Sequence, residues 1–314
     1  MNPPPRVMVE ARDLFKHFPG VFAVQNLTLS VLEGEIFGLV GPDGAGKTTV
    51  LRLLAGVMPP TGGTAIIDGI DVRADPDLAK QHLSYMPQRF GLYEDLTVDE
   101  NIRFYADIFE VPKKIRDERI RPLLQSFGME EFQKRLAGQL SGGMKQKLGL
   151  ICALIHTPKI LLLDEPTTGV DPVSRRDFWK ILYDLREGGV TILVSTAYLE
   201  EAERCTRLAL FHQGRLEYCD TPANLKKMMP GKLLNIVSSR AREAQKTIGA
   251  LEGVSGVLLM GDHVHVAVDD DLRRIPEIGR TLEEAGIPFE PVTITEPTME
   301  DLFIGLLEKG EGKS

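Results

Sequence analysis

A short apolar run that ends in a glycine-rich loop constrains this chain more than any other feature. Ile36–Val40 has the length and the apolar character of a buried strand. The sequence GPDGAGKTT follows at Gly41–Thr49 and fits the pattern G-x-x-x-x-G-K-[S/T] between a strand and a helix. We therefore expect a strand, a tight loop and a helix that begins near Gly46.

The residue types of this loop suit a nucleotide phosphate. Glycines let backbone N–H groups point inward, and the helix N-terminus adds positive potential. Lys47 can reach the β- and γ-phosphates, and the Thr48 hydroxyl is a suitable ligand for Mg²⁺. The expected nucleotide-binding residues of the loop are Gly41, Pro42, Asp43, Gly44, Ala45, Gly46, Lys47, Thr48 and Thr49.

Further apolar runs of strand length occur at Ile160–Leu163 and Thr191–Ser195. Strands alternate with helical patterns from about Val7 to Leu225, which predicts an α/β fold with a parallel sheet. Ile115–Phe132 has the pattern of a charged, amphipathic helix within this region.

The sequence texture changes at Thr221–Gly231, where helix-start and breaker residues indicate a domain boundary. The expected elements beyond it are strand Leu233–Val237, helix Ala241–Leu251, strands Val254–Met260 and Val264–Val268, helix Leu272–Ala285 and strand Ile287–Ile294. This βαββαβ order predicts a small ferredoxin-like domain. A last helix is expected at about Thr298–Leu307, after Pro297.

Composition excludes some classes of function. The chain has 37 basic and 45 acidic residues, a net charge of −8, which argues against nucleic-acid binding by the whole surface. Cys152, Cys205 and Cys219 show no metal or redox spacing and fit a reducing cytosol. The N-terminus lacks a signal-peptide pattern, and runs such as Leu148–Ile155 fall short of the roughly 20 residues that span a bilayer. We expect a cytoplasmic protein.

Three further motifs carry a resemblance to a known family. LSGGM at Leu140–Met144 resembles the LSGGQ signature of ABC-type ATPases, and ILLLDEP at Ile160–Pro166 resembles their Walker B strand, followed by a D-loop around Asp171. Gln88 lies where the family has its Q-loop. The C-terminal sequence EPTMEDLFIGLL is similar to an extension on the ATPase subunits of drug-resistance-type and polysaccharide-type ABC exporters.

The resemblance implies a fold and two domains. It implies a P-loop NTPase core of the ABC-ATPase type at residues 1–225, with a helical signature subdomain at about 90–155. Residues 231–314 then form the small α+β domain, for which regulation, dimer contacts or ligand binding all stay open. His263 and His265 alternate on one strand there, without a third metal ligand.

The resemblance also implies roles for individual residues. Asp164 ends an apolar strand, where a hard carboxylate can hold Mg²⁺, and Glu165, on the other face of the strand, can polarise an attacking water as general base. The implied catalytic residues are Glu165, Lys47 and Gln88, and the implied Mg²⁺ ligands are Thr48, Gln88 and Asp164. Phe18 is placed to stack on adenine, and Ser141, Gly142 and Gly143 are placed to close over ATP bound to an opposite subunit.

Three positions depart from the usual family pattern. Asp43 replaces Asn in the phosphate loop, and Met144 replaces Gln in the signature. Ser195–Ala202 aligns with the switch segment of the family, which normally has a His at its third position that contacts the γ-phosphate. Here that position is Ala197, and alanine has no polar atom for this contact. Losing one such donor costs on the order of 10²–10³ in rate. Either hydrolysis is slow or partner-assisted, or a neighbour such as Tyr198 takes over.

These observations predict an ATP- and Mg²⁺-dependent ATPase that drives a separate integral-membrane permease from the inner face of the membrane. One set of motifs implies pairing with a second ATP-binding subunit, as a homodimer or a heterodimer. One alternative is a soluble ABC-type ATPase in nucleic-acid or ribosome processes, although residues 50–139 are too short for the coiled-coil insertion of DNA-repair relatives. Another is an ATP-binding regulator with little hydrolysis.

Overall fold

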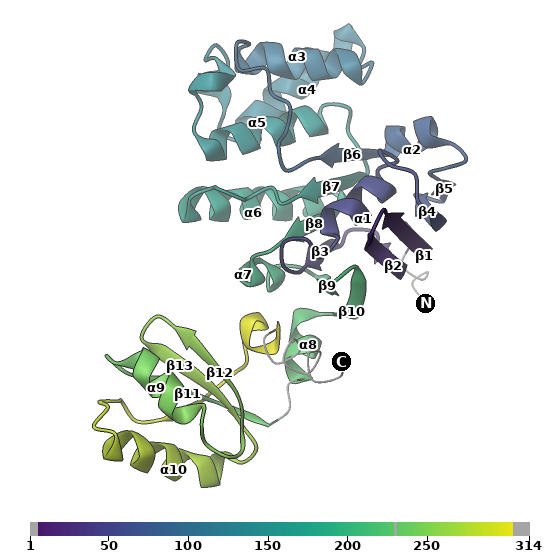
Figure 1. The fold of residues 1–314 in the computed structure, drawn as a ribbon. Coiled ribbons are helices and arrows are strands. Elements are labelled where there is room, and N and C mark those ends of the chain that lie inside the picture. The colour runs from purple at the N-terminus through teal and green to yellow at the C-terminus, as the bar shows by residue number, and fades with distance from the viewer. Residues whose placement is uncertain (1–5, 229–230, 304–314) are drawn as a thin grey trace, which may run out of the picture. The chain divides into compact units, whose positions relative to one another are not determined.

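The computed structural model describes residues 6–228 and 231–303 (Figure 1). The chain divides into two compact units, Met1–Cys219 and Asp220–Ser314. The sequence pattern placed the boundary between residues 225 and 231, so the division lies several residues earlier in the chain. Within the described ranges, no helix combines the length and the apolar character that crossing a membrane requires.

A six-stranded sheet runs through the first unit. Its strand order is β10-β9-β3-β8-β7-β6, and the neighbours from β9 to β6 pair in parallel. The strands are β3 (Ile36–Val40), β6 (Leu83–Met86), β7 (Ile160–Asp164), β8 (Thr191–Thr196), β9 (Arg207–His212) and β10 (Arg215–Asp220). Every residue of β3, β7 and β8 is buried, as a parallel sheet requires. The predicted parallel sheet is confirmed, and its register places the carboxyl ends of these three strands together.

A second sheet of this unit is antiparallel, with the order β2-β1-β4-β5. The strands are β1 (Val7–Phe18), β2 (Val21–Leu32), β4 (Gly62–Ile67) and β5 (Ile70–Asp71). The predicted alternation of strands and helices is therefore wrong at residues 7–32, where β1 and β2 form a hairpin. Pro19 and Gly20 make its two-residue turn, and Gly20 has a φ of 79°.

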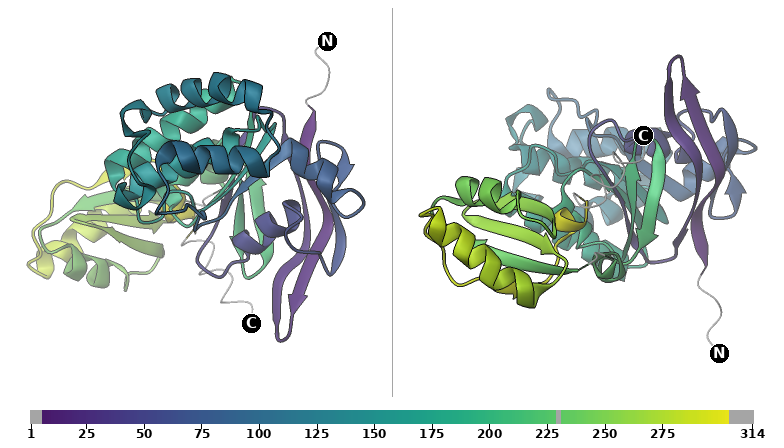
Figure 2. Two further views of the ribbon diagram at one scale, coloured as in Figure 1. Left: turned by 90° about the horizontal axis from the view of Figure 1, so that it is seen from above. Right: turned by 60° about the horizontal axis from the view of Figure 1, so that its bottom comes forward.

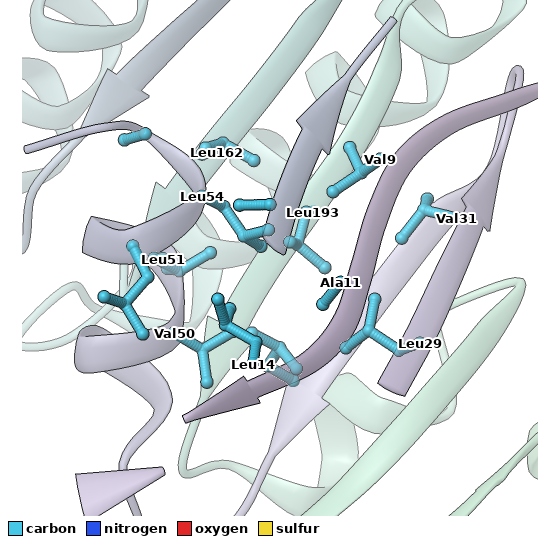
Figure 3. Close-up of a cluster of buried hydrophobic side chains, with 14 of the residues drawn as sticks. Val9, Ala11, Leu14, Leu29, Val31, Val50, Leu51, Leu54, Leu162 and Leu193 are labelled. Atoms are coloured by element: carbon cyan, nitrogen blue, oxygen red, sulfur yellow. The ribbon is translucent and has the colours of Figure 1, made fainter. Parts of the chain in front are cut away.

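A hydrophobic core of this unit lies between the antiparallel sheet and helix α1 (Lys47–Leu54). Figure 3 shows side chains from β1, β2 and α1 gathered with two from the parallel sheet: Val9, Ala11, Leu14, Leu29, Val31, Val50, Leu51, Leu54, Leu162 and Leu193. Full burial of each valine or leucine side chain in this cluster stabilises the fold by about 1.5–3 kcal/mol. The packing therefore fixes α1 and, with it, the loop that precedes the helix.

The described residues of this unit form six further helices: α2 (Pro76–His82), α3 (Val98–Ile108), α4 (Lys113–Ser126), α5 (Gly142–Leu154), α6 (Pro172–Glu187) and α7 (Leu199–Ala202). Helices α3, α4 and α5 are grouped within the range expected for a helical subdomain (Figures 1 and 2). The single helix predicted at Ile115–Phe132 is partly wrong. Helix α4 ends at Ser126, Gly128 adopts a φ of 63°, and a separate 3-10 turn covers Glu130–Phe132.

The second unit begins with α8 (Pro222–Lys227) and then has the βαββαβ order that the sequence predicts. The elements are β11 (Lys232–Val237), α9 (Ala241–Ile248), β12 (Val254–Met260), β13 (His263–Val268), α10 (Asp271–Glu284) and β14 (Thr293–Thr295). The sheet order is β12-β13-β11-β14, with antiparallel pairs throughout. Apolar side chains of α9 and α10 share one buried cluster with β11 and β13. Its assignment to the ferredoxin-like folds stays a prediction.

The helix predicted at Ala241–Leu251 ends at Ile248, and two other predicted elements depart further from the structure. The strand predicted at Ile287–Ile294 is reduced to β14, because Ile287, Phe289 and Val292 pack against the core from an irregular segment. Of the helix predicted at Thr298–Leu307, residues 299–303 are helical, and the remainder lies outside the described residues.

Candidate functional site

The loop between β3 and α1 can form only because two of its residues have no side chain. A Cβ atom on Gly41 would lie 2.1 Å from the carbonyl oxygen of Phe211, and one on Gly46 would lie 2.2 Å from that of Ala23. Gly46 also has a φ of 106°, which side chains disfavour. It caps α1 without any side-chain hydrogen bond, so the helix N-terminus is free of a competing carboxylate or hydroxyl. The predicted strand, loop and helix are confirmed.

Lys47 is buried at the start of α1, beside the loop. Its side chain is 3% exposed, and its ammonium group lies 2.8 Å from the carbonyl oxygen of Gly41 and 3.0 Å from that of Pro42. The same group lies 3.2 Å from Oε1 of Glu165. Oxygen atoms therefore surround the ammonium group, and phosphate oxygens can replace them without a new cost of burying charge.

A cavity of about 380 Å³ opens beside this loop, within the usual range for small-molecule sites. The residues that line it are Val21, Phe22, Ala23, Gly44, Ala45, Gly46, Lys47, Thr48, Thr49, Glu165 and Gln213. Gly41, Pro42 and Asp43, which were also predicted to bind nucleotide, are not among these lining residues. Asp43 is exposed at the surface of the loop. The cavity thus joins the phosphate loop to the tip of the β1–β2 hairpin.

Asp164 and Thr48 form an oxygen pair that fits a magnesium ion. Asp164 is 1% exposed, and its Oδ1 accepts hydrogen bonds from the Thr48 hydroxyl at 3.0 Å and the Ser195 hydroxyl at 2.8 Å. The Tyr85 hydroxyl donates to Oδ2 at 3.3 Å. Burial, together with the nearby Asp164 charge, raises the pKa of Tyr85, so the phenol stays a donor. Hard oxygens in small number suit Mg²⁺, which keeps waters and phosphate oxygens as its other ligands.

Glu165 lies one residue beyond β7, in a turn rather than on the strand. Its φ of 47° is left-handed, so strand alternation does not set its direction as the sequence argument assumed. The backbone N–H of Glu165 donates to the carbonyl oxygen and the hydroxyl of Ser195, at 3.2 and 3.0 Å. Gln88 donates to Oε2 of Glu165 at 3.0 Å, and Thr168 donates to the same atom at 3.3 Å. The structure therefore brings together Lys47, Glu165 and Gln88, the three predicted catalytic residues.

The predicted signature residues lie at the start of α5, apart from the cavity lining. Ser141 and Gly142 are exposed, and the Ser141 hydroxyl caps the helix by accepting the N–H of Met144 at 3.3 Å. Gly143 is buried, and a Cβ atom there would lie 2.6 Å from that of Ser174 in α6. The packing of α5 against α6 thus gives Gly143 a structural role within the subunit, while Ser141 and Gly142 stay open to solvent.

The hairpin tip presents an aromatic residue that the sequence argument missed. Phe22 is 61% exposed and lines the cavity, whereas Phe18, 36% exposed, is absent from the lining residues. The two lie near each other because Phe18 pairs with Val21 across the turn. Lys16 places its ammonium group 5.2 Å from the centre of the Phe18 ring. Only the pairing of β1 with β2 identifies Phe22, since no local motif marks it.

No side chain of the switch segment is among the residues that line the cavity. Ala197 follows the last residue of β8 and is exposed. The Tyr198 ring lies under the guanidinium group of Arg175, whose central carbon is 4.1 Å from the ring centre. Neither Ala197 nor Tyr198 lines the cavity. In this conformation Tyr198 is therefore engaged with α6 rather than with the nucleotide site.

The histidines of the second unit have ordinary structural partners. His263 lies 2.9 Å from the side-chain oxygen of Asn235, and His265 lies 3.0 Å from Asp301. Among the residues that the structure describes, no group of three or more His, Cys, Asp or Glu side chains could hold a metal. Cys152 and Cys205 are buried, and burial raises the pKa of both thiols, which suits the expected inert role.

Comparison with known proteins agrees with this geometry. The family model described as ABC transporter matches residues 24–168. The chain is 41% identical over 309 residues to the "Probable multidrug ABC transporter ATP-binding protein YbhF" of Escherichia coli, covering 96% of this chain and 52% of that protein. It is 33% identical to the daunorubicin resistance ATP-binding protein DrrA2 of Streptomyces coeruleorubidus, covering 95% of this chain and 94% of that one.

A solved dimeric structure of a bacterial ABC transporter cassette is also similar, with a TM-score of 0.62 at 28% identity. The match covers 68% of this chain and 98% of the cassette. The chain spans about half the length of YbhF, the first of these relatives. The phosphate loop, the Walker B carboxylates and the signature thus occur in a chain that belongs to the ATP-binding proteins of the ABC transporter family.

Proposed function

We propose that this chain is the subunit of an ABC exporter that binds and hydrolyses ATP and thereby drives a separate membrane permease. The observation that carries the proposal is the cluster of Lys47, Glu165 and Gln88 at the mouth of the phosphate loop. A buried cation, a carboxylate and an amide meet there beside a cavity of nucleotide size. This combination serves phosphoryl transfer, in which catalysis is mainly positioning and charge stabilisation.

Each residue of the cluster has a distinct task in the proposed reaction. ATP binds with its phosphates along Gly44–Thr49, and Lys47 exchanges loop carbonyls for phosphate oxygens. Glu165, relieved of its contact with Lys47, accepts a proton from the attacking water, and Gln88 keeps that carboxylate in place. Magnesium, when bound with ATP at Thr48 and Asp164, neutralises charge on the phosphates.

The exposed start of α5 supports a dimeric arrangement. Ser141 and Gly142 face solvent at a helix N-terminus, which can receive an anion from another subunit. We propose that Ser141–Gly143 closes over ATP bound to an opposite ATP-binding subunit, which is either a second copy or a homologue. The dimeric cassette that this chain resembles supports the arrangement.

Export is the direction that the relatives favour. YbhF is named a probable multidrug ABC transporter protein and DrrA2 a daunorubicin resistance protein, and a further relative, from Burkholderia lata, is named a Nod factor export ATP-binding protein. We extend this direction to the present chain, together with a place on the inner face of the membrane beside a permease. Because the chain spans about half of YbhF, the assembly around it belongs to the same proposal.

Ala197 favours a second candidate, an ATP-binding regulator with little hydrolysis. The switch segment contributes no polar group to the cavity lining, whereas Lys47 and Thr48, which we propose to hold phosphate and Mg²⁺, line it. Measured turnover separates the two candidates, because both bind ATP and only one consumes it.

The decisive measurement compares wild-type ATP turnover with that of Glu165→Gln. Loss of a general base costs on the order of 10²–10⁴ in rate, and we expect such a fall in kcat with ATP affinity retained. Glu10→Gln is the matched control, because Glu10 is a carboxylate of β1 that pairs with Arg12 and does not line the cavity. Equal turnover by wild type and Glu165→Gln would contradict the proposed mechanism.

Membrane association tests the transport part of the proposal. The full chain, tagged and expressed at native level, should co-purify with an integral-membrane protein from gently solubilised membranes. That membrane protein should stimulate ATP turnover when the two are reconstituted in vesicles. Reproducible recovery with ribosomes or DNA, and with no membrane protein, would favour the soluble alternative instead.

A further inference from the structure

We propose that Glu201 is a positioning residue that fastens the loop carrying Glu165 to the switch segment, and so substitutes for the anchoring that Ala197 cannot supply. The inference rests on the proposed hydrolysis of ATP. It concerns a carboxylate of the switch segment that does not line the cavity.

Glu201 is a deeply buried carboxylate with two hydroxyl partners. It is 1% exposed, and its Oε1 accepts a hydrogen bond from the Thr167 hydroxyl at 2.7 Å. Its Oε2 accepts one from the Thr196 hydroxyl, also at 2.7 Å. Both bonds are short, as charge-assisted hydrogen bonds are. Burial of a carboxylate is unfavourable unless such partners satisfy it, so the three side chains are held as a unit.

The two threonines belong to different sides of the catalytic site. Thr167 follows Glu165 by two residues, in the loop between β7 and α6. Thr196 ends β8, directly before Ala197, and its carbonyl oxygen accepts the N–H of Gly41 at 3.3 Å. One carboxylate therefore links the loop of the general base to the switch segment, next to the start of the phosphate loop.

The same contact fixes the backbone beyond Ala197. The N–H of Tyr198 donates to the Thr196 hydroxyl at 3.0 Å, so this hydroxyl accepts from the switch segment and donates to Glu201. Arg175 of α6 adds a charge 3.7 Å from Oε1 of Glu201 and covers the Tyr198 ring. The position of the segment is therefore set from inside the subunit, without any group at residue 197.

The chemistry of the contact requires a carboxylate. A carboxylate accepts at both oxygens, whereas an amide accepts at one and donates at the other. In Glu201→Gln, one threonine hydroxyl would face a donor in place of an acceptor. If that hydroxyl is the one of Thr196, it would accept from both the amide and the Tyr198 N–H, and its own proton would lose its acceptor. A substitution of nearly unchanged volume should thus loosen the loop of Glu165.

The test measures kcat, KM and equilibrium ATP affinity for Glu201→Gln in the full chain. A misplacement of about 1 Å can cost on the order of 10²-fold in rate, so we expect kcat to fall 10- to 100-fold with KM and affinity little changed. Thr167→Val removes one of the two bonds and should lower kcat less. Combined with Glu201→Gln it should add little, because the residues act together.

Glu35→Gln is the matched structural control. Glu35 is a buried glutamate, 6% exposed, that lies just before β3, at the end of the sheet opposite to the catalytic site. It accepts a hydrogen bond from the backbone N–H of Leu32 and forms an ion pair with Arg207. This substitution should lower thermal stability without a selective loss of kcat. If Glu201→Gln fails to fold, Thr167→Val alone carries the test, and an unchanged kcat in that variant overturns the inference.

Glu165→Gln, measured in parallel, separates this inference from the proposed function. Loss of turnover in Glu165→Gln with wild-type kcat in Glu201→Gln overturns the positioning role and leaves the proposed function intact. Wild-type turnover in Glu165→Gln overturns both. Equal losses of kcat and stability in Glu201→Gln and Glu35→Gln would show a general structural effect and also overturn the inference.

Discussion

The phosphate loop and the switch segment lie side by side at the carboxyl ends of β3 and β8, where Val40 pairs with Thr196. Their polar side chains differ in what they contact. In the phosphate loop, Lys47 and Thr48 line the cavity. In the switch segment at residues 195–202, Ser195, Thr196 and Glu201 are buried and bonded within the protein. The residue between them to which the family resemblance assigns a γ-phosphate contact is Ala197, which does not line the cavity.

This difference separates nucleotide binding from nucleotide turnover. In the proposed mechanism, ATP binding depends on the loop backbone, Lys47 and the Thr48–Asp164 pair, all of which the chain retains. Turnover in the same proposal depends on how Glu165 and a water are held, and we propose that the switch segment contributes through buried contacts rather than through a donor to the γ-phosphate. Substitutions on the two sides should therefore change different constants.

The largest effect is expected on the phosphate side, from Lys47→Ala. Removing the ammonium group takes away charge stabilisation in the ground state and in the transition state. We expect turnover to fall by at least 10²–10³-fold and ATP affinity to fall as well. Turnover assays and equilibrium titration with a fluorescent ATP analogue measure the two effects. Unchanged ATP affinity would contradict the proposed difference between the two regions, because ATP binding would then not depend on the phosphate loop.

Ala197→His should change turnover in the opposite direction. A histidine there restores a polar group next to the site, and one transition-state donor is worth on the order of 10²–10³ in rate. We expect kcat to rise by up to that factor with ATP affinity little changed. Ala197→Leu is the control for added bulk without a donor. A wild-type kcat equal to or above that of Ala197→His would show that the segment already functions without a donor at residue 197.

Phe22→Ala should weaken nucleotide binding more than Phe18→Ala. Stacking of a base on an aromatic ring contributes about 1–3 kcal/mol, or about 5- to 150-fold in Kd. Phe22 lines the cavity and Phe18 does not, so the loss should follow Phe22. Titration of both variants with ATP and with tripolyphosphate separates base contacts from phosphate contacts. A larger loss in Phe18→Ala would show that the hairpin rearranges when ATP binds.

The sequence was most informative where a function depends on neighbouring residues. The strand, the loop and the helix around Gly41–Thr49 follow from local glycines and apolar runs, and Asp164 and Glu165 follow from the resemblance of Ile160–Pro166 to a Walker B strand. Phe22 and Glu201 could not be found in this way. Phe22 reaches the cavity only through the β1–β2 hairpin, and Glu201 stands in the sequence LEEA, which resembles an exposed helical turn until Thr167 and Thr196 fold against it.

The smallest effect is expected from Asp43→Asn, which restores the usual family residue in the phosphate loop. Asp43 is exposed and does not line the cavity, so its charge is largely screened by solvent. Exposed charges contribute up to about 1 kcal/mol, which limits the change in ATP affinity to about fivefold, and kcat should stay the same. Asp43→Asn removes a negative charge that lies outside the site but near the phosphates. ATP should therefore bind slightly more tightly to this variant, and the gain should shrink as the salt concentration is raised. A change in kcat comparable to that of Ala197→His would place Asp43 within the catalytic geometry and remove the distinction between the two sides.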